Sequence, residues 1–321
     1  MTLTQLNAFV LVARLGSVTA AASALGVSEP AVSQALTALR QHLGDQLITR
    51  GPGGMTLTAG GSRLLATASQ IVVLGAEAHA AVRAAQGAPE QLRVVATSTF
   101  AEFVAGPLIE AFTRRFPGPV EVSTGVAVSG EQAVLVANRL ADIAFGPGVA
   151  PAAGTAAEGS MPVFSEPIFK YRLVIVTARQ SRLHGPARQW RWLVDPAGAD
   201  PGSETGRLLA QLGVPDANIG VFPSQTAAWA AAADGAGAAP AIEHLVSQQL
   251  RRGDLSLVEL PGLPAEAVWH ATLPEREHRS TAASALRRFL GTPEAMQLMR
   301  SPSAGVRPSR FRPPVYVTIW S

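Results

Sequence analysis

The sequence of 321 residues has no cysteine and one lysine, and no stretch of it approaches 18 uninterrupted apolar residues. Without cysteine the chain can form no disulfide, thiol nucleophile or cysteine-ligated zinc site, which fits a reducing cytoplasm. Without a long apolar stretch it is not expected to partner a membrane. The N-terminus also lacks the basic start and cleavage site of an export signal. The sequence therefore predicts a soluble cytoplasmic protein.

Charge and metal ligands are also scarce. The 26 basic residues barely exceed the 23 acidic ones, for a net charge of +3. Within residues 1–62, Arg14, Arg40 and Arg50 stand against Glu29 and Asp45. Binding to nucleic acid must therefore be argued from geometry and not from bulk charge. The six histidines show no metal-ligand spacing, so neither a metal nor another cofactor is expected.

Two short helical patterns flank a glycine in residues 19–50, TAAASALGVSEPAVSQALTALRQHLGDQLITR. A first helix over residues 3–13 is expected before them, capped by Thr2 or Thr4. Thr19 is expected to cap the next helix and Gly26 to end it, while Ser28 caps the one after. That last helix carries an apolar stripe, and its opposite face is polar: Glu29, Pro30, Ser33, Gln34, Thr37 and Gln41. Such a pair predicts a helix-turn-helix whose polar face enters a major groove.

A helical hairpin alone is equally typical of an ordinary bundle, and the following segment favours DNA binding. Leu47, Ile48 and Arg50 precede GPGG and MTLTAGG, a pattern that predicts a small hairpin wing with a basic residue at its base.

Residues 3–61 resemble the winged helix-turn-helix of LysR-type transcriptional regulators, through LNAFVLVARLGSVTAAASALGVSEPAVSQALTALRQHLGDQLITR and LTAGG. A fainter likeness continues to about residue 295. The resemblance implies double-stranded DNA as a partner, with the start of the recognition helix against base edges and Arg50 with the wing against the backbone. The expected DNA contacts are Thr19, Ser28, Glu29, Pro30, Ser33, Gln34, Thr37 and Arg50.

The sequence departs from the family at two positions. Glu29 stands where glutamine is usual, and the wing GPGGM lacks the usual basic residues. A glutamate can only accept hydrogen bonds, so Glu29 either accepts from a cytosine amine or faces water and repels phosphate. With few cations, affinity is expected to depend weakly on salt.

Residues 63–88 read as one long helix that links the DNA-binding domain to the rest of the chain. Its stripe has a period of 3.5 residues: Leu64, Ala68, Ile71, Gly75, Ala78 and Val82. Packing against the same chain is one interpretation. Dimerisation is favoured, because a helix-turn-helix gains affinity from two half-sites, and the family resemblance implies dimers that also pair into tetramers.

From residue 91 strands and helices alternate, which predicts an α/β fold with a mostly parallel sheet. Two such sets, with a double crossing, resemble the two-lobed, doubly wound effector-binding domain of the same family. We predict residues 1–62 as the winged helix-turn-helix, 63–88 as the linker and 89–300 as the effector domain. Within it, lobe I spans 91–161 and 265–300, lobe II spans 162–264, and a tail covers 301–321.

Ligands of open parallel sheets lie beyond the carboxyl ends of strands, where helices begin. This rule selects TSTF, VSGE, PGSET and SQTA, although each hydroxyl also suits a simple helix cap. The expected effector contacts are Ser98, Thr99, Phe100, Val128, Ser129, Gly202, Ser203, Ser224 and Gln225. Hydroxyls and amide donors suit a small anionic or polar metabolite.

Two other classes of function compete with a regulator. An enzyme is disfavoured, because no G-x-S-x-G elbow, Walker loop or dinucleotide fingerprint is present. A solute-binding protein would have no use for the first 60 residues. The C-terminal SPSAGVRPSRFRPPVYVTIWS reads either as a solvated tail or as an arm that packs on another subunit.

Overall fold

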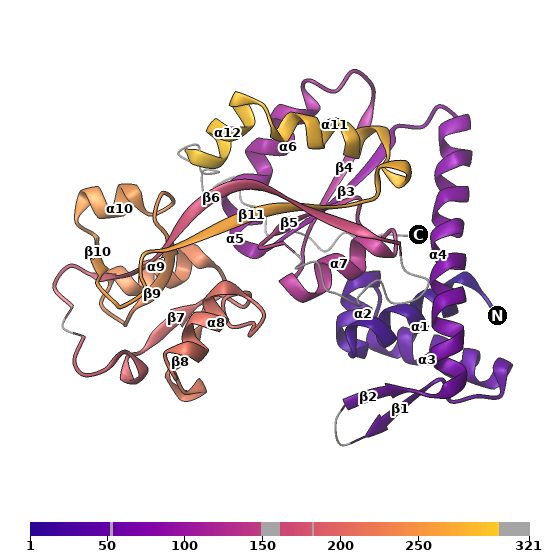
Figure 1. The fold of residues 1–321 in the computed structure, drawn as a ribbon, viewed down its shortest axis with the longest axis horizontal. Helices are drawn as coiled ribbons and strands as arrows, with labels where there is room; N and C mark the ends of the chain where they lie inside the picture. Colours follow the sequence, from indigo (N-terminus) through magenta and orange to yellow (C-terminus); the bar gives the residue numbers. More distant parts are fainter. Residues whose placement is uncertain (52–53, 149–160, 182, 302–321) are drawn as a thin grey trace.

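The computed structural model describes residues 1–51, 54–148, 161–181 and 183–301. The chain begins with a helical head and ends in a larger α/β domain (Figure 1). The head contains α1 (Leu3–Leu15), α2 (Val18–Leu25), α3 (Glu29–Leu43) and the antiparallel strands β1 (Ile48–Gly51) and β2 (Gly54–Leu57). The predicted tail beyond Ser301 and the centre of the wing at residues 52–53 lie outside the described residues.

Short polar residues and glycines set the helix boundaries of the head. Thr2 caps α1 in a capping box with Gln5, and Gly26 ends α2 in the left-handed conformation with φ +66°. Ser28 caps α3 by accepting a hydrogen bond from the Ala31 N–H. The prediction for α2 was wrong by two residues, because Ser17 is its cap and Thr19 lies inside the helix. The Ser17 hydroxyl accepts from the Ala20 N–H, the third of the helix. Ser17 and Thr19 are both residue types that cap helices, so the sequence alone fitted either one.

The long helix α4 (Ala59–Ala85) starts at the wing and belongs to the head over its first half. Leu65, Ala68 and Val72 are buried in one apolar core with α1 and α3. By length and composition α4 could cross a membrane; Leu65, Ala68 and Val72 on its apolar side pack in the head core, whereas Leu74 and Val82 are exposed. Its second half leaves the head and stands at the edge of the molecule (Figure 1).

The α/β domain begins with lobe I. Its elements are β3 (Glu90–Ala96), α5 (Ser98–Phe100), a π-helical turn (Ala101–Ala105), α6 (Gly106–Thr113), β4 (Val120–Val126), α7 (Ser129–Ala137) and β5 (Ile143–Gly146). β3 pairs in parallel with β4 and β5, as predicted. After lobe II the chain returns to add α11 (Thr281–Leu290) and α12 (Pro293–Arg300), which lie beside α6 (Figure 1).

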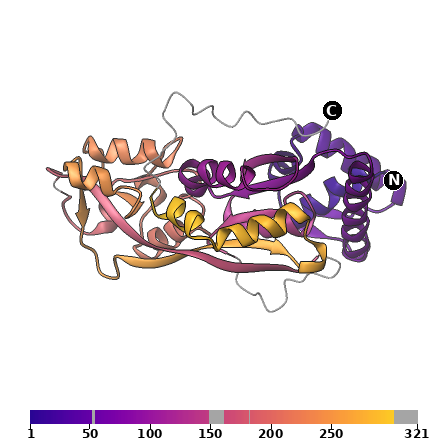
Figure 2. The same ribbon diagram turned by 90° about the horizontal axis from the view of Figure 1, so that it is seen from above.

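Two long strands, β6 (Val163–Ala178) and β11 (Ala265–Pro274), connect the lobes, and the whole of β11 pairs antiparallel with β6 up to Leu173. Lobe II lies between them in the sequence. It contains β7 (Trp192–Val194), α8 (Glu204–Gln211), β8 (Ile219–Val221), α9 (Gln225–Ala233), β9 (Ala239–Ile242), α10 (Ser247–Arg252) and β10 (Leu255–Val258), with 3-10 turns at Ala187–Gln189 and Asp216–Asn218; a further 3-10 turn, Arg276–His278, follows β11. The head and lobe II occupy opposite ends of an elongated molecule (Figure 2).

The main sheet differs from the mostly parallel sheet that the sequence predicted. Its seven strands follow the order β10-β6-β11-β5-β3-β4, with β9 also paired to β6, and every pair that involves β6 or β11 is antiparallel. The reason is the double crossing. The chain enters lobe II on one strand and leaves it on a neighbour, so these two strands must run in opposite directions. The two-lobed α/β architecture itself is confirmed.

The head also contacts lobe I of the same chain through α7. Val134 and Leu140 pack against the apolar core of the head, and α1 contacts α7. Arg139 Nη2 donates to Glu77 Oε1 of α4 at 2.9 Å, with the arginine side chain 11% exposed. One helix of the α/β domain is therefore in direct contact with both the head and the linker helix.

Candidate DNA-binding face and effector pocket

The exposed face of α3 gathers most of the polar residues predicted to contact DNA. The eight predicted contacts are all exposed, and six of them lie on α3 or its cap: Ser28, Glu29, Pro30, Ser33, Gln34 and Thr37. Opposite them, Val32, Leu36 and Leu39 are buried in the head core. The Thr37 hydroxyl donates to the Ser33 carbonyl at 2.9 Å, which fixes its orientation on this face.

The wing is held to α3 and α4 by a small set of polar contacts. Arg40 Nη2 on α3 donates to the Ile48 carbonyl of β1 at 3.1 Å. Asp45 accepts from the Leu47 N–H at 2.6 Å and from the Thr58 hydroxyl at 2.7 Å, and these hydrogen bonds lower the pKa of the Asp45 carboxyl. The turn before β1 is thereby tied to the start of α4, and Arg50 projects from the strand that follows it.

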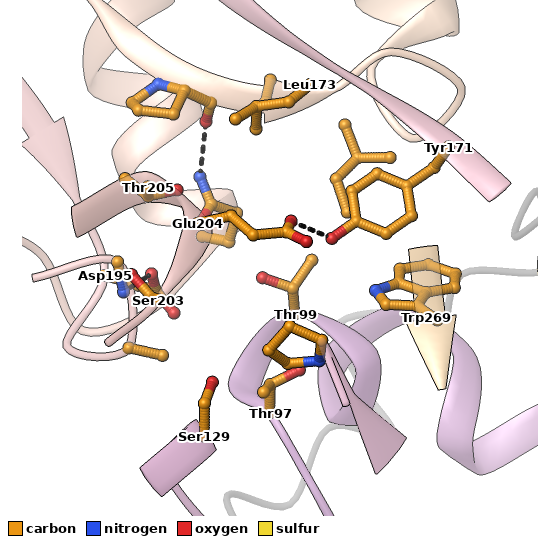
Figure 3. Close-up of a pocket in the computed structure, with 17 residues that line it drawn as sticks. Thr97, Thr99, Ser129, Tyr171, Leu173, Asp195, Ser203, Glu204, Thr205 and Trp269 are labelled. Carbon is orange, nitrogen blue, oxygen red and sulfur yellow. Dashed lines mark hydrogen bonds between the residues drawn. The ribbon is translucent and has the colours of Figure 1, made fainter. Parts of the chain in front are cut away.

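A second candidate site is a cavity of about 70 Å³ between the lobes (Figure 3). Lobe I contributes the starts of α5 and α7, the connecting strands contribute aromatic side chains, and lobe II contributes the start of α8, the loop after β7, and β9. The lining residues are Thr97, Thr99, Ser129, Pro147, Tyr171, Leu173, Asp195, Ala197, Gly198, Ser203, Glu204, Thr205, Gln225, Pro240, Ala241, Ile242 and Trp269.

Four of the nine predicted effector contacts line this cavity: Thr99, Ser129, Ser203 and Gln225. Successive helical residues point about 100° apart, so a helix start presents only part of its first turn to a cavity. Phe100 is fully buried, stacks on Phe145 at 4.6 Å and does not line the cavity.

The other four predicted contacts are also absent from the lining. Ser98 donates its hydroxyl to Asp195, so this hydroxyl joins the two lobes. Ser224 accepts from the Ala227 N–H and caps α9, the simpler role that the sequence allowed. Val128 and Gly202 lie one residue before lining serines, Ser129 and Ser203, and do not themselves line the cavity.

Sequence reasoning missed the aromatic and acidic side chains of the cavity. The rings of Tyr171 on β6 and Trp269 on β11 contact each other in a tilted arrangement with centroids 5.0 Å apart, and Trp269 packs edge-on against Phe100 at 5.1 Å. In the sequence, alternating apolar residues in a strand indicate only a core. The pairing of β6 with β11, which brings the two rings together, has no local signature.

Glu204 is the charged group that faces Tyr171 across the cavity. It is the first residue of α8, after the cap Ser203, and the Tyr171 hydroxyl donates to its Oε2 (Figure 3). Burial raises the pKa of Glu204, while the Tyr171 hydrogen bond and electrostatic interactions with Arg207 and His270 partly offset that effect. Burial, and then the adjacent Glu204 charge, raise the pKa of Tyr171.

Comparison with known proteins decides the family. Residues 3–62 match the family model for the bacterial regulatory helix-turn-helix protein of the lysR family, and residues 85–292 match the LysR substrate binding domain. The chain belongs to the LysR family. It is a DNA-binding transcriptional regulator and not an enzyme, with a helix-turn-helix and an effector domain in one chain.

Relatives of this LysR-family regulator agree with that assignment along the whole chain. An uncharacterised HTH-type transcriptional regulator of Mycobacterium tuberculosis is 36% identical over 100% of both chains. CfxR of Cupriavidus necator, also an HTH-type transcriptional regulator, is 28% identical over 90% of this chain and 91% of its own.

Solved structures show the same fold at lower identity. A full-length AphB structure gives a TM-score of 0.56 at 17% identity, over 91% of this chain and 99% of its own. ArgP from Mycobacterium tuberculosis gives 0.52 at 20% identity, over 89% and 94%.

Proposed function

We propose that this LysR-family regulator reads its operator with the exposed face of α3. The observation that carries the proposal is the clustering of Ser33, Gln34 and Thr37 on an unobstructed helix face, with Arg50 on the adjacent wing. Hydroxyl and amide groups of this length hydrogen-bond base edges, and an arginine beside them suits a phosphate. The site of action would be the cytoplasm, where chromosomal DNA is accessible.

The role of Glu29 on this face is open between a base contact and a purely structural role. As the first residue of α3 it is exposed, and a carboxylate there also gains from the helix dipole. Selection of random DNA by wild type and by Glu29→Gln separates readout from this structural role. A changed consensus at one position supports base readout. Identical consensus sites would leave Glu29 with the helix-dipole role alone.

The main test of the proposal is a footprint on the DNA upstream of the protein's own gene, with random DNA as competitor. Gln34→Ala is expected to lower site-specific affinity by about 1–3 kcal/mol, or roughly 5- to 150-fold, and to relax the sequence preference. His42→Ala, an exposed change on the same helix outside the proposed face, is the matched control. Equal effects of the two substitutions would contradict the assignment of this face.

We infer that the second half of α4 joins two copies of the chain. The predicted stripe is not all available, because Ala68 is fully buried in the head core and Gly75 faces Leu3 of the same chain. Leu74 and Val82 remain 62% and 58% exposed, with Ala78 between them at four-residue steps. An exposed apolar helix face of this kind is typical of an interface. The proposed dimer seam is therefore centred on Leu74, Ala78 and Val82.

Sedimentation of a charged variant tests this seam. Leu74→Glu is expected to shift the protein toward monomer, and with it to weaken binding to a two-half-site operator. Leu257→Glu introduces the same charge at a leucine that is 50% exposed in lobe II, and serves as the control. A Leu74→Glu protein that keeps the mass and operator affinity of wild type would refute the seam.

The cavity between the lobes is the proposed effector site, and α7 is the proposed connection to DNA binding. Ser129 at the start of α7 lines the cavity, while Arg139 just beyond its end bonds to Glu77 of the linker helix. A ligand that moves α7 would therefore shift the head relative to lobe I. Such a shift would alter the spacing of two heads on DNA.

A further inference from the structure

The cavity between the lobes carries acidic side chains, although the sequence led us to expect an anionic or a polar metabolite there. Its lining includes two carboxylates, Asp195 and Glu204, and no lysine, arginine or histidine belongs to the lining among the described residues. A simple carboxylate or phosphate ligand would therefore meet two carboxylates in the lining, while Arg207 and His270, which interact electrostatically with Glu204, lie outside the lining. Of the anionic and polar metabolites expected from the sequence, this lining favours a polar ligand that is not a simple anion.

The two carboxylates are not equivalent. Asp195 is 1% exposed and already accepts from the Ser98 hydroxyl and from the Gly198 N–H, so its role is to join protein segments. Glu204 accepts only the Tyr171 hydroxyl, at Oε2, among the described residues. Its Oε1 thus keeps its hydrogen-bonding capacity for a donor that enters the cavity.

The surroundings of Glu204 favour a positively charged donor. Burial of a carboxylate is costly, and an ammonium group that bonds directly to it recovers part of that cost. The aromatic rings of Tyr171 and Trp269 lie beside the same space, where they can contact a cation or the apolar part of a ligand (Figure 3).

The opposite side of the cavity is made of hydrogen-bond donors. The hydroxyls of Thr99 and Ser129 and the indole nitrogen of Trp269 face the cavity (Figure 3). Ser129 also begins α7, a helix of nine residues whose first N–H groups favour negative charge. Donors on the lobe I side and an acceptor on the lobe II side would fit a ligand with both charges.

We propose that the effector is a small zwitterion, with a protonated amine on Glu204 and a carboxylate held by Thr99, Ser129 and the start of α7. This inference rests on the proposed function, since it names the ligand class of the same cavity. The cavity volume of about 70 Å³ limits the ligand to a small molecule, such as a free amino acid. Because each lobe holds one end, binding would also fix the lobes relative to each other.

The test is a titration of the full-length protein with the proteinogenic amino acids, followed by thermal shift and by calorimetry for each hit. Every hit is compared with its deaminated acid and its decarboxylated amine. We expect at least one amino acid to bind, and both of its truncated forms to bind at least about tenfold more weakly. Plain carboxylates that bind as tightly as the zwitterion would overturn the proposal, as would a panel in which no amino acid binds.

A matched set of variants assigns the amine to Glu204. Glu204→Gln keeps the size of the side chain and removes its charge, and it is expected to raise the dissociation constant about tenfold or more. Tyr171→Phe keeps the ring and is expected to cause a smaller loss. Glu266→Gln, an exposed glutamate on β11, is expected to bind as wild type does. An unchanged constant in a folded Glu204→Gln protein would refute the assignment.

Operator binding separates this proposal from the function on which it rests. Glu204→Gln is expected to lose the response of operator affinity to the amino acid, whereas Glu266→Gln is expected to keep both this response and the ligand-free affinity of wild type. An amino acid that binds in calorimetry while wild type shows no site-specific DNA binding would sink the proposed operator readout and leave the ligand class standing. Site-specific DNA binding with no amino-acid ligand would do the reverse.

Discussion

Two glycines of α4 are expected to respond to alanine with opposite signs. At Gly61 an added Cβ would lie 2.0 Å from the Leu47 carbonyl oxygen and 2.9 Å from its carbonyl carbon. Both are backbone atoms, and the Leu47 carbonyl already accepts from the Thr58 N–H at 3.0 Å. At Gly75 the nearest atoms are the methyl groups of Leu3 at 3.0 and 3.1 Å, and that side chain is 41% exposed and can rotate away.

The magnitudes follow from what must move. Gly61→Ala requires a backbone displacement of the turn before the wing and strains the Leu47–Thr58 hydrogen bond, at a cost of about 2–4 kcal/mol. Gly75→Ala replaces the poorest non-proline helix former by the best and should gain up to about 1 kcal/mol, less the small cost of moving Leu3. For a head of this size, 2 kcal/mol corresponds to a decrease of roughly 8 °C or more in its Tm.

The assay is thermal unfolding at fixed protomer concentration, with hydrogen exchange of the α1 and α3 amides as the local readout. Protection of these amides is expected to fall about thirtyfold or more in Gly61→Ala and to hold or rise in Gly75→Ala. Operator affinity should fall with the first variant only. A Gly61→Ala protein with wild-type Tm and protection would refute the reasoning from close backbone approach.

Three further predictions concern the α/β domain and its contact with the linker helix α4. Because burial raises the pKa of Glu204, ionisation of this carboxyl destabilises the folded state at neutral pH, and Glu204→Gln should raise the Tm at pH 7. The gain in Tm should disappear toward about pH 4, where the carboxyl is also protonated in the unfolded chain. A Tm lowered equally at all pH values would contradict this prediction. Arg93→Met leaves the 7%-exposed Asp142 carboxylate unpaired and should cost about 3 kcal/mol in denaturant unfolding, whereas Arg114→Met, at a pair 60% and 73% exposed, should cost under about 0.5 kcal/mol. Glu77→Gln should lower the stability by at most about 1 kcal/mol yet weaken the effect of ligand on operator affinity, and an undiminished effect would argue against α7 as the connection.

Features that depend on local sequence signals could be predicted. The helix-turn-helix was found because Gly26 and Ser28 mark a helix end and a helix start within three residues, and both act as expected. The long helix α4 was found from its periodicity. The surfaces that pack against α4 could not be predicted, because an apolar stripe does not indicate which surface covers it. Ala68 of the predicted stripe is buried in the core of its own chain.

Features that depend on distant pairing were not predictable. Neighbouring strands were taken as mostly parallel because strands alternated with helices, whereas β6 and β11 pair across 86 residues of intervening chain. The same pairing brings Tyr171 to Trp269 and builds one wall of the cavity. The sequence identified candidate residues at helix starts but not which of their hydroxyls face the cavity. Ser98, for example, does not line the cavity, because its hydroxyl bonds to Asp195.

Two glutamates that each follow a serine show the limit of prediction from local sequence. Glu29 and Glu204 each follow a serine cap and each open a helix, so the dipole accounts equally for both. Glu29 is exposed on the head, and only DNA could give it a further role. Glu204 is partly buried against a tyrosine hydroxyl, where the dipole gain does not explain why a carboxylate was kept at the cost of desolvation. A retained cost of this kind is typical of a binding site, and it is the tertiary placement of Glu204 that directs the search for its ligand toward amines.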